Sequence, residues 1–190
     1  MNEATALLLV DLQTGAFGGH GIPPLQDADE LLRNVRALLC EARAAGVPVV
    51  HVQHCANRGE VFEEGTSGWS IVGALMPEAG EVVVRKRASN AFEGTDLEQV
   101  LQRLGARRIL VTGLQSEHCV AATCRGALRL GYSVQLAEDG HGTWPDEARS
   151  ARDIIESENE ALAREGVTLR TTDRLVDELR ARRPTGMARR

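Results

Sequence analysis

The chain has 190 residues, 43% hydrophobic and 26% charged, with a formal net charge of −5 at pH 7. This length predicts a single domain over residues 1–183, followed by a frayed tail over residues 184–190. The mild acidity and the lack of an apolar run long enough to cross a membrane exclude nucleic acid and membrane as partners, and without a visible signal peptide the expected location is the cytoplasm.

Short apolar strands alternate with amphipathic helices along the chain. Residues 4–10 form a continuous apolar run, typical of a strand buried on both faces, and residues 27–46 repeat leucine and valine at helical spacing. The other predicted elements are strands over 47–53, 81–85, 108–112, 133–137 and 167–171, and helices over 96–104, 117–130, 146–165 and 173–182. Residues 54–80 are irregular. This alternation predicts an α/β fold with three layers, α/β/α, around a mostly parallel sheet.

Three reactive side chains follow predicted strands. Asp11 ends the first strand, Lys86 ends the third, and Cys119 lies on the loop after the fourth. Because ligands collect at the carboxyl ends of parallel strands, we expect all three at one edge of the sheet. We place Cys119 in the first turn of a helix, where unpaired amides and a nearby ammonium should lower its pKa. A carboxylate that accepts the thiol proton completes a nucleophile, base and cation suited to covalent acyl transfer.

Lysine is almost absent from the chain. Lys86 is the only lysine among the 22 basic residues. A bias toward arginine codons explains the arginines but not the exception. A lysine ammonium is more compact than a guanidinium, so Lys86 is a candidate for a role that arginine cannot fill. Chance retention of one lysine is the alternative.

A set of short motifs occurs in a fixed order along the chain. They are Leu-Leu-Leu-Val-Asp-Leu-Gln over 7–13, Gly-Val-Pro-Val-Val over 46–50, Lys86 six residues before Phe92, Gly-Thr-Asp-Leu over 94–97, Gly-Leu-Gln-Ser-Glu-His-Cys-Val over 113–120, and Gly-Tyr at 131–132. On these motifs the chain resembles the isochorismatase-like cysteine hydrolases over roughly residues 4–180. One departure is Ser116, where the family usually has threonine, although both offer a hydroxyl.

The resemblance implies a catalytic triad and an oxyanion hole. The triad is Asp11, Lys86 and Cys119. A cis peptide bond is implied at Leu114–Gln115, and it would turn the Gln115 amide toward that of Cys119 to bind an oxyanion. The implied reaction is hydrolysis of a carbon–nitrogen bond, in an amide, ureido or lactam-like small molecule, through a thioester on Cys119. Relatives are usually oligomers, so a homo-oligomer is expected.

Other functions stay open on the sequence alone. One is a catalytically silent binding or scaffold protein with the same fold. Another is an isochorismatase-type ether hydrolase, although the resemblance implies that those enzymes lack the cysteine. A receiver domain is less favoured because Cys119 would be idle in it. A dinucleotide-binding enzyme is disfavoured because no GxGxxG motif follows Val10.

The segment at the second strand indicates whether the chain has the ligands for a metal ion. Relatives that deaminate nicotinamide carry an aspartate and histidines there as metal ligands. This chain has His51 and His54 but no aspartate among residues 51–54, and residues three apart in a strand point to opposite faces. The four cysteines fit no zinc signature. We therefore predict no metal and no cofactor.

Four further residues are candidate substrate contacts. Phe17, Trp69 and Phe92 are predicted on loops near the site and suit an apolar wall, with core packing as the alternative for each. Gln13, two residues after Asp11, either binds substrate or fixes the loop. The irregular segment over 54–80 is expected to set substrate specificity.

Overall fold

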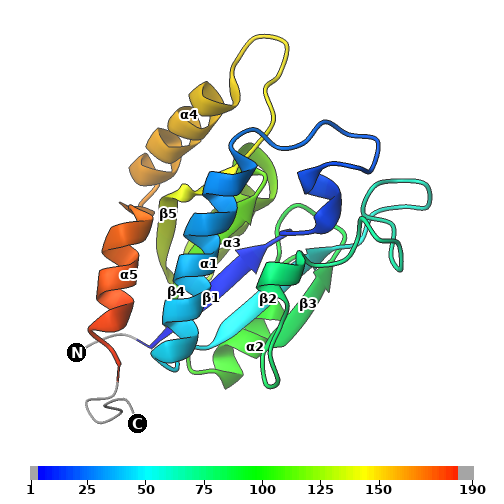
Figure 1. The fold of residues 1–190 in the computed structure, drawn as a ribbon. Coiled ribbons are helices and arrows are strands. Elements are labelled where there is room, and N and C mark those ends of the chain that lie inside the picture. The colour runs from blue at the N-terminus through cyan, green and yellow to red at the C-terminus, as the bar shows by residue number, and fades with distance from the viewer. Residues whose placement is uncertain (1–3, 184–190) are drawn as a thin grey trace, which may run out of the picture.

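Six strands form one sheet in the computed structural model, which describes residues 4–183. The strands are β1 (Thr5–Val10), β2 (Val49–His54), β3 (Val82–Lys86), β4 (Arg108–Leu114), β5 (Ser133–Gly142) and β6 (Thr168–Arg170). Their order across the sheet is β3-β2-β1-β4-β5-β6, and each neighbouring pair is parallel (Figure 1). The expected α/β class is confirmed. The predicted tail over 184–190 lies outside the described residues.

Helices cover both faces of the sheet, so the molecule has three layers (Figure 1). The α-helices are α1 (Ala28–Ala44), α2 (Leu97–Arg103), α3 (Ala121–Arg129), α4 (Ala151–Arg164) and α5 (Thr172–Arg180). Helices α1 and α5 pack on one face, and α2, α3 and the Leu162 end of α4 pack on the other. No helix within residues 4–183 is long and apolar enough to cross a membrane.

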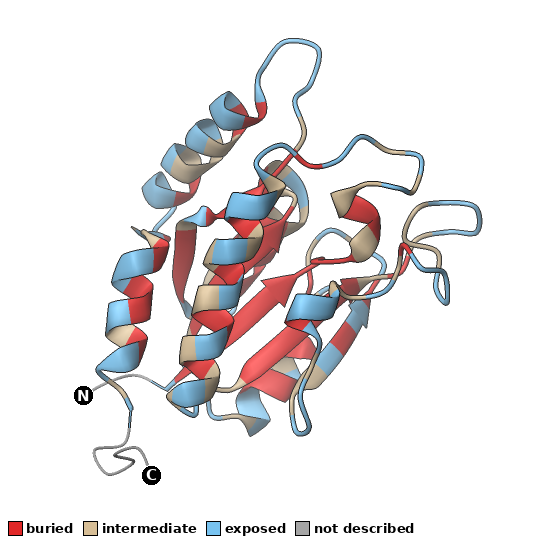
Figure 2. Ribbon diagram, in the orientation of Figure 1, coloured by how far each residue is buried: buried red, intermediate tan, exposed pale blue. Residues whose placement is uncertain are grey.

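Strand β1 shows why an unbroken apolar run is needed at the centre of the sheet. Leu7 and Leu9 belong to the apolar cluster with α1 and α5, whereas Leu8 and Val10 belong to the cluster on the opposite face. Each residue of β1 is buried, as the red colour of the central strands shows in Figure 2. A strand covered on both faces cannot alternate polar and apolar residues.

Two predicted boundaries were wrong by several residues. Helix α4 begins at Ala151 rather than at residue 146, because Ser150 and Asp153 form a reciprocal capping box. Strand β5 runs on to Gly142, beyond the expected end at residue 137. The pairing of β4 with β5 shifts register between Val111 and Gly113, and this bulge lets β5 continue.

The strand order fixes where a ligand can bind. The chain moves outward from β1 to β3 and then returns to place β4 on the other side of β1. The carboxyl ends of β1 and β4 therefore flank the point at which the direction of the sheet reverses, where open α/β sheets have their binding crevice. Asp11 follows β1 there, and the loop that begins at Gln115 follows β4.

Candidate active site

Asp11, Lys86 and Cys119 meet at the carboxyl edge of the sheet. Asp11 directly follows β1 in a left-handed backbone conformation with φ of 52°, which is uncommon outside glycine. Lys86 is the last residue of β3, and its Nζ lies 2.8 Å from Asp11 Oδ2 and 3.0 Å from Cys119 Sγ. The structure thus brings together the three residues predicted from strand ends.

The Lys86 ammonium is enclosed by acceptors. Its Nζ also donates to the carbonyl oxygen of Ala88 at 3.1 Å and lies 3.3 Å from His54 Nδ1. Burial lowers the pKa of Lys86, but the Asp11 carboxylate and the Cys119 sulfur outweigh it, so the pKa is raised overall. Lys86 is therefore charged at neutral pH.

The pKa of the Cys119 thiol corrects the prediction made from helix position. Burial and the Asp11 charge raise this pKa to about 12, against the lowering effect of Lys86. Cys119 also lies inside a π-helical turn, η3 (Ser116–Val120), rather than in the first turn of α3. The resting site thus holds a neutral thiol. Asp11 Oδ1 is buried and has no hydrogen-bond partner among the described residues, so it is open to accept a proton.

A tight loop connects β4 to Cys119. The Leu114–Gln115 peptide bond is cis, at the position that the family resemblance implies. Gly113 has φ of 131°, and a Cβ there would overlap the Val10 carbonyl, so only glycine fits. The Gln115 carbonyl then accepts from the amide of Val120 at 3.0 Å, which folds the loop back over the end of β4.

Buried polar groups hold this loop from behind. His141 Nδ1 lies 2.8 Å from Ser116 Oγ, and its Nε2 lies 3.0 Å from Asn159 Oδ1. Asn159 Nδ2 donates to the Glu138 carbonyl, so its Oδ1 is the acceptor for a proton on His141 Nε2. His141 Nδ1 therefore accepts from the Ser116 hydroxyl. Burial lowers the pKa of His141 and keeps the ring neutral, as this arrangement requires.

A cavity of about 230 Å³ opens beside the sulfur. Asp11, Gln115 and Cys119 line its reactive end, and His54, Phe62 and Trp144 are among its walls. Both residues predicted to form the oxyanion hole, Gln115 and Cys119, thus face the space next to the thiol.

The side chain of Gln13, a predicted substrate contact, forms its hydrogen bonds within the protein. It is fully buried, and it donates to the carbonyls of His54 and Trp69 at 3.0 and 2.9 Å. Its Oε1 accepts from the His54 amide at 2.8 Å. The side chain therefore ties the loop after β1 to the end of β2 and to the loop that carries Trp69, which is the alternative role considered for it, and it does not line the cavity.

The three predicted aromatic contacts also lie outside the cavity lining. Phe92 stacks on Tyr132 with ring centroids 6.1 Å apart. Trp69 donates from Nε1 to a buried cysteine sulfur and lies under the Arg85 guanidinium, 4.8 Å from its ring centroid. Phe17 packs against the apolar cluster beneath α1.

Sequence reasoning missed three walls of the cavity. His54 is the last residue of β2, so the strand-end rule applied to Asp11 also applies to it. Trp144 follows β5, whose extension to Gly142 was not expected. Phe62 comes from the irregular segment over 54–80, which has no periodicity to interpret.

The histidines of β2, His51 and His54, do not fit the metal of nicotinamide-deaminating relatives. His51 Nε2 is committed to Glu81 at 2.9 Å, and Glu81 in turn accepts from Arg43. His54 Nδ1 faces the Lys86 ammonium, whose charge would repel a metal ion. Within residues 4–183, no group of three or more His, Cys, Asp or Glu side chains is arranged to hold one.

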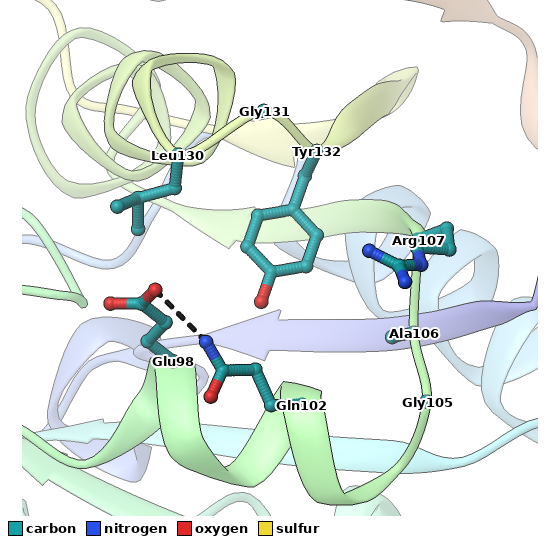
Figure 3. A pocket seen from close by; sticks show the side chains of 8 residues that line it. All are labelled: Glu98, Gln102, Gly105, Ala106, Arg107, Leu130, Gly131 and Tyr132. Atoms are coloured by element: carbon teal, nitrogen blue, oxygen red, sulfur yellow. Dashed lines mark hydrogen bonds between the residues drawn. The ribbon is translucent and has the colours of Figure 1, made fainter.

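A second hollow of about 270 Å³ lies at the opposite edge of the sheet. Figure 3 shows Tyr132 pointing toward Glu98 and Gln102, which are joined by a hydrogen bond, with Arg107 nearby. Arg107 precedes β4 and Tyr132 precedes β5, so this hollow is at the amino ends of the strands. Its lining includes no cysteine, serine or lysine, so it holds none of the thiol and ammonium chemistry found at the carboxyl edge.

Comparison with known proteins identifies the family. Residues 5–155 match the Isochorismatase domain. The chain belongs to the isochorismatase family. A solved isochorismatase from Pseudomonas putida KT2440 is 30% identical with a TM-score of 0.84, over 90% of this chain and 89% of that one.

Two curated relatives carry names that specify a reaction. Streptothricin hydrolase of Streptomyces noursei is 42% identical over 139 residues, which are 73% of this chain and 54% of that protein. Ureidoacrylate amidohydrolase RutB of Yersinia enterocolitica is 26% identical over 184 residues, covering 78% of this chain and 80% of RutB. The chain thus spans about half the length of the streptothricin hydrolase that it matches.

Proposed function

We propose that the protein is a cysteine amidohydrolase of the isochorismatase family. It cleaves a carbon–nitrogen bond of a small amide, ureido or lactam-like molecule through a thioester on Cys119. The observation that carries this proposal is the buried cluster in which the Lys86 ammonium contacts both Asp11 and Cys119, which in turn line a cavity. The hydrolase and amidohydrolase names of two relatives support the same reaction class.

The first step forms the tetrahedral intermediate. Asp11 takes the proton from Cys119 Sγ as the sulfur attacks the substrate carbonyl carbon, which avoids a free thiolate in a site where the thiol pKa is about 12. The carbonyl oxygen gains the negative charge, and the amides of Gln115 and Cys119 donate to it. Lys86 contacts the carboxylate and the sulfur and keeps the two groups next to each other throughout the step.

The second step releases the amine, and the third regenerates the enzyme. Asp11 gives its proton to the departing nitrogen as the carbon–nitrogen bond breaks, leaving the acyl group on Cys119. Asp11 then takes a proton from a water molecule whose oxygen attacks the thioester. The carboxylic acid leaves, and the proton returns to the sulfur. Asp11 is thus base, acid and base again within one turnover.

His54 orients the substrate in this scheme. Burial and the Lys86 charge lower the pKa of His54, so the ring is neutral at pH 7. Because Nδ1 faces an ammonium, it is the acceptor and the ring proton sits on Nε2. His54 also lines the cavity, where this N–H is available to a carbonyl or carboxylate of the substrate.

Ammonia release from a panel of primary amides and ureas tests the proposal. We expect the wild-type protein to release ammonia from at least one of them, and the Asp11→Asn variant to release none above background. Circular dichroism checks that this variant is folded. A folded wild-type protein that hydrolyses no amide, ureido or lactam compound would overturn the proposed function.

A further inference from the structure

An apolar hollow adjoins the catalytic cavity. It has a volume of about 600 Å³, and its apolar walls are Ile22, Pro23, Pro24, Trp144 and Pro145. We call this hollow the apolar annex. Gln115 and Trp144 line both the annex and the catalytic cavity, so the two spaces border the same two side chains.

The annex is built from restrained backbone. Its three prolines have fixed φ angles, which limits how far the two loops can deform. Trp144 Nε1 donates to the Pro23 carbonyl at 2.8 Å and ties the loop after β5 to the loop before α1. The neighbouring Leu25 is buried and anchors the second loop to the core. The annex is therefore formed before any ligand arrives.

Volume and chemistry indicate what the annex takes. Pockets that hold small organic ligands measure about 300–1,000 Å³, and the catalytic cavity of about 230 Å³ falls below this range unless the annex is added. The annex lining contains no charged side chain, and its two polar members, Gln26 and Gln115, are neutral amides. A charged group would find no oppositely charged side chain among the lining residues.

We propose that the annex binds an apolar substituent of the substrate, an alkyl chain or a plain aromatic ring joined to the scissile amide. This inference rests on the proposed amidohydrolase function and adds the class of substrate. The carbonyl would lie between Cys119 and the Gln115 amide. Because Gln115 also borders the annex, a group attached to that carbonyl or to its nitrogen reaches the annex directly.

Ligand affinity for a Cys119→Ala variant measures binding in the annex without hydrolysis of the ligand. Calorimetry would compare acetamide, butyramide, hexanamide and 4-phenylbutyramide, which extend the acyl side, with N-butyl- and N-hexylacetamide, which extend the amine side. We expect affinity to rise about fourfold per added methylene in one of the two series, as burial of each CH₂ predicts. Equal affinities along both series would overturn the proposal.

A second experiment places a charged side chain in the annex. In the Cys119→Ala background, Ile22→Asp should lower the ratio of hexanamide to acetamide affinity by about tenfold, or the corresponding ratio in the amine series. Met76→Asp, at an exposed apolar residue outside both cavities, is the control and should keep the ratio. An unchanged ratio in Ile22→Asp would contradict the annex. If that variant instead converts an oligomer into monomers and keeps the ratio, the hollow is a contact between copies and the proposal fails.

Turnover by the wild-type protein separates the two proposals. Affinity that rises with chain length but is accompanied by no hydrolysis supports the annex and overturns the amidohydrolase function. Hydrolysis with no dependence of affinity on chain length supports the function and overturns the annex.

Discussion

Lys86 Nζ lies 2.8 Å from Asp11 Oδ2, and both side chains are almost completely buried. Such a pair is stable only because each charge compensates the other, and removing one partner from a buried pair destabilises a protein by about 3–5 kcal/mol. The two charges of the pair therefore neutralise each other within the site. A substitution that keeps the positive charge of Lys86 tests whether the shape of its side chain matters. A substitution that removes a charge from the pair tests whether the charge is needed as well.

Lys86→Arg keeps the charge and changes the shape. Nζ is enclosed by four groups at 2.8–3.3 Å, so a planar guanidinium must displace Asp11 or Cys119. Because a misplacement of about 1 Å can lower a rate about 100-fold, we expect kcat/KM to fall by about that factor, nearly as far as in Lys86→Ala. The neighbouring Arg85→Lys is the control and should be close to wild type. Near-normal turnover by Lys86→Arg would mean that positive charge alone suffices.

Asp11→Asn should make Cys119 easier to deprotonate while abolishing turnover. Burial and the Asp11 charge raise the pKa of the thiol to about 12, so removal of that charge lowers the pKa, whereas Lys86→Ala removes a cation and raises it. The pH dependence of iodoacetamide alkylation at Cys119, measured by peptide mass spectrometry, would give both shifts. A Cys40→Ser background removes the exposed cysteine. A higher thiol pKa in Asp11→Asn than in wild type would contradict this electrostatic account.

Glu81 links His51 in β2 to Arg43 in α1 and stabilises the fold at neutral pH. Burial raises its pKa, but hydrogen bonds from Arg43, the Glu78 amide and His51 outweigh burial and lower it to about 2. A lowered folded-state pKa stabilises above the unfolded value near 4.5, and this stabilisation is lost as pH falls toward 2. Glu81→Gln should therefore lower the free energy of unfolding by about 2 kcal/mol at pH 7.

Urea unfolding between pH 7 and pH 3 measures that effect. The gap between wild type and Glu81→Gln should narrow as the pH falls below about 4.5. Glu64→Gln, which breaks an exposed ion pair with Arg85, is the matched control and should change stability by less than about 1 kcal/mol. A gap that stays constant down to pH 3 would show that the Glu81 charge is not responsible.

Chelation should leave the proposed amidohydrolase activity unchanged. The only strand-end histidine in the cavity wall, His54, faces the Lys86 ammonium rather than further ligands among residues 4–183. Dialysis against EDTA and phenanthroline, followed by an ammonia assay, checks this expectation. Activity that is lost on chelation and restored by zinc or iron would identify a metal site that the donor arrangement does not suggest.

The sequence predicts the fold and the clustering of Asp11, Lys86 and Cys119 because both follow from simple constraints. Buried parallel strands need unbroken apolar runs such as residues 4–10, and residues after such strands meet at one edge. The strand-end rule therefore places Asp11 and Lys86 without knowledge of the helices. The cavity walls follow no such rule. Trp144 reaches the cavity through a bulge that extends β5, and Phe62 comes from a segment without periodicity.

The thiol pKa could not be predicted because opposing effects act on it at once. A helix start and an ammonium both favour a thiolate, and these were visible from the order of elements. The degree of burial and the closeness of the Asp11 carboxylate depend on the packed structure. Their effect on the thiol pKa is larger, so the pKa is raised. Gln13 illustrates the same limit, since its position suits substrate binding but its hydrogen bonds join the end of β2 to the loop that carries Trp69.

The turnover of Cys119→Ala tests the central claim most directly. If Cys119 is the nucleophile, the variant should lose at least about 10³-fold in kcat on the best substrate of the amide panel while keeping the wild-type melting temperature. Cys40→Ala, which removes an exposed cysteine, should retain full activity. A folded Cys119→Ala protein that keeps more than about a tenth of wild-type kcat would contradict covalent catalysis by this residue.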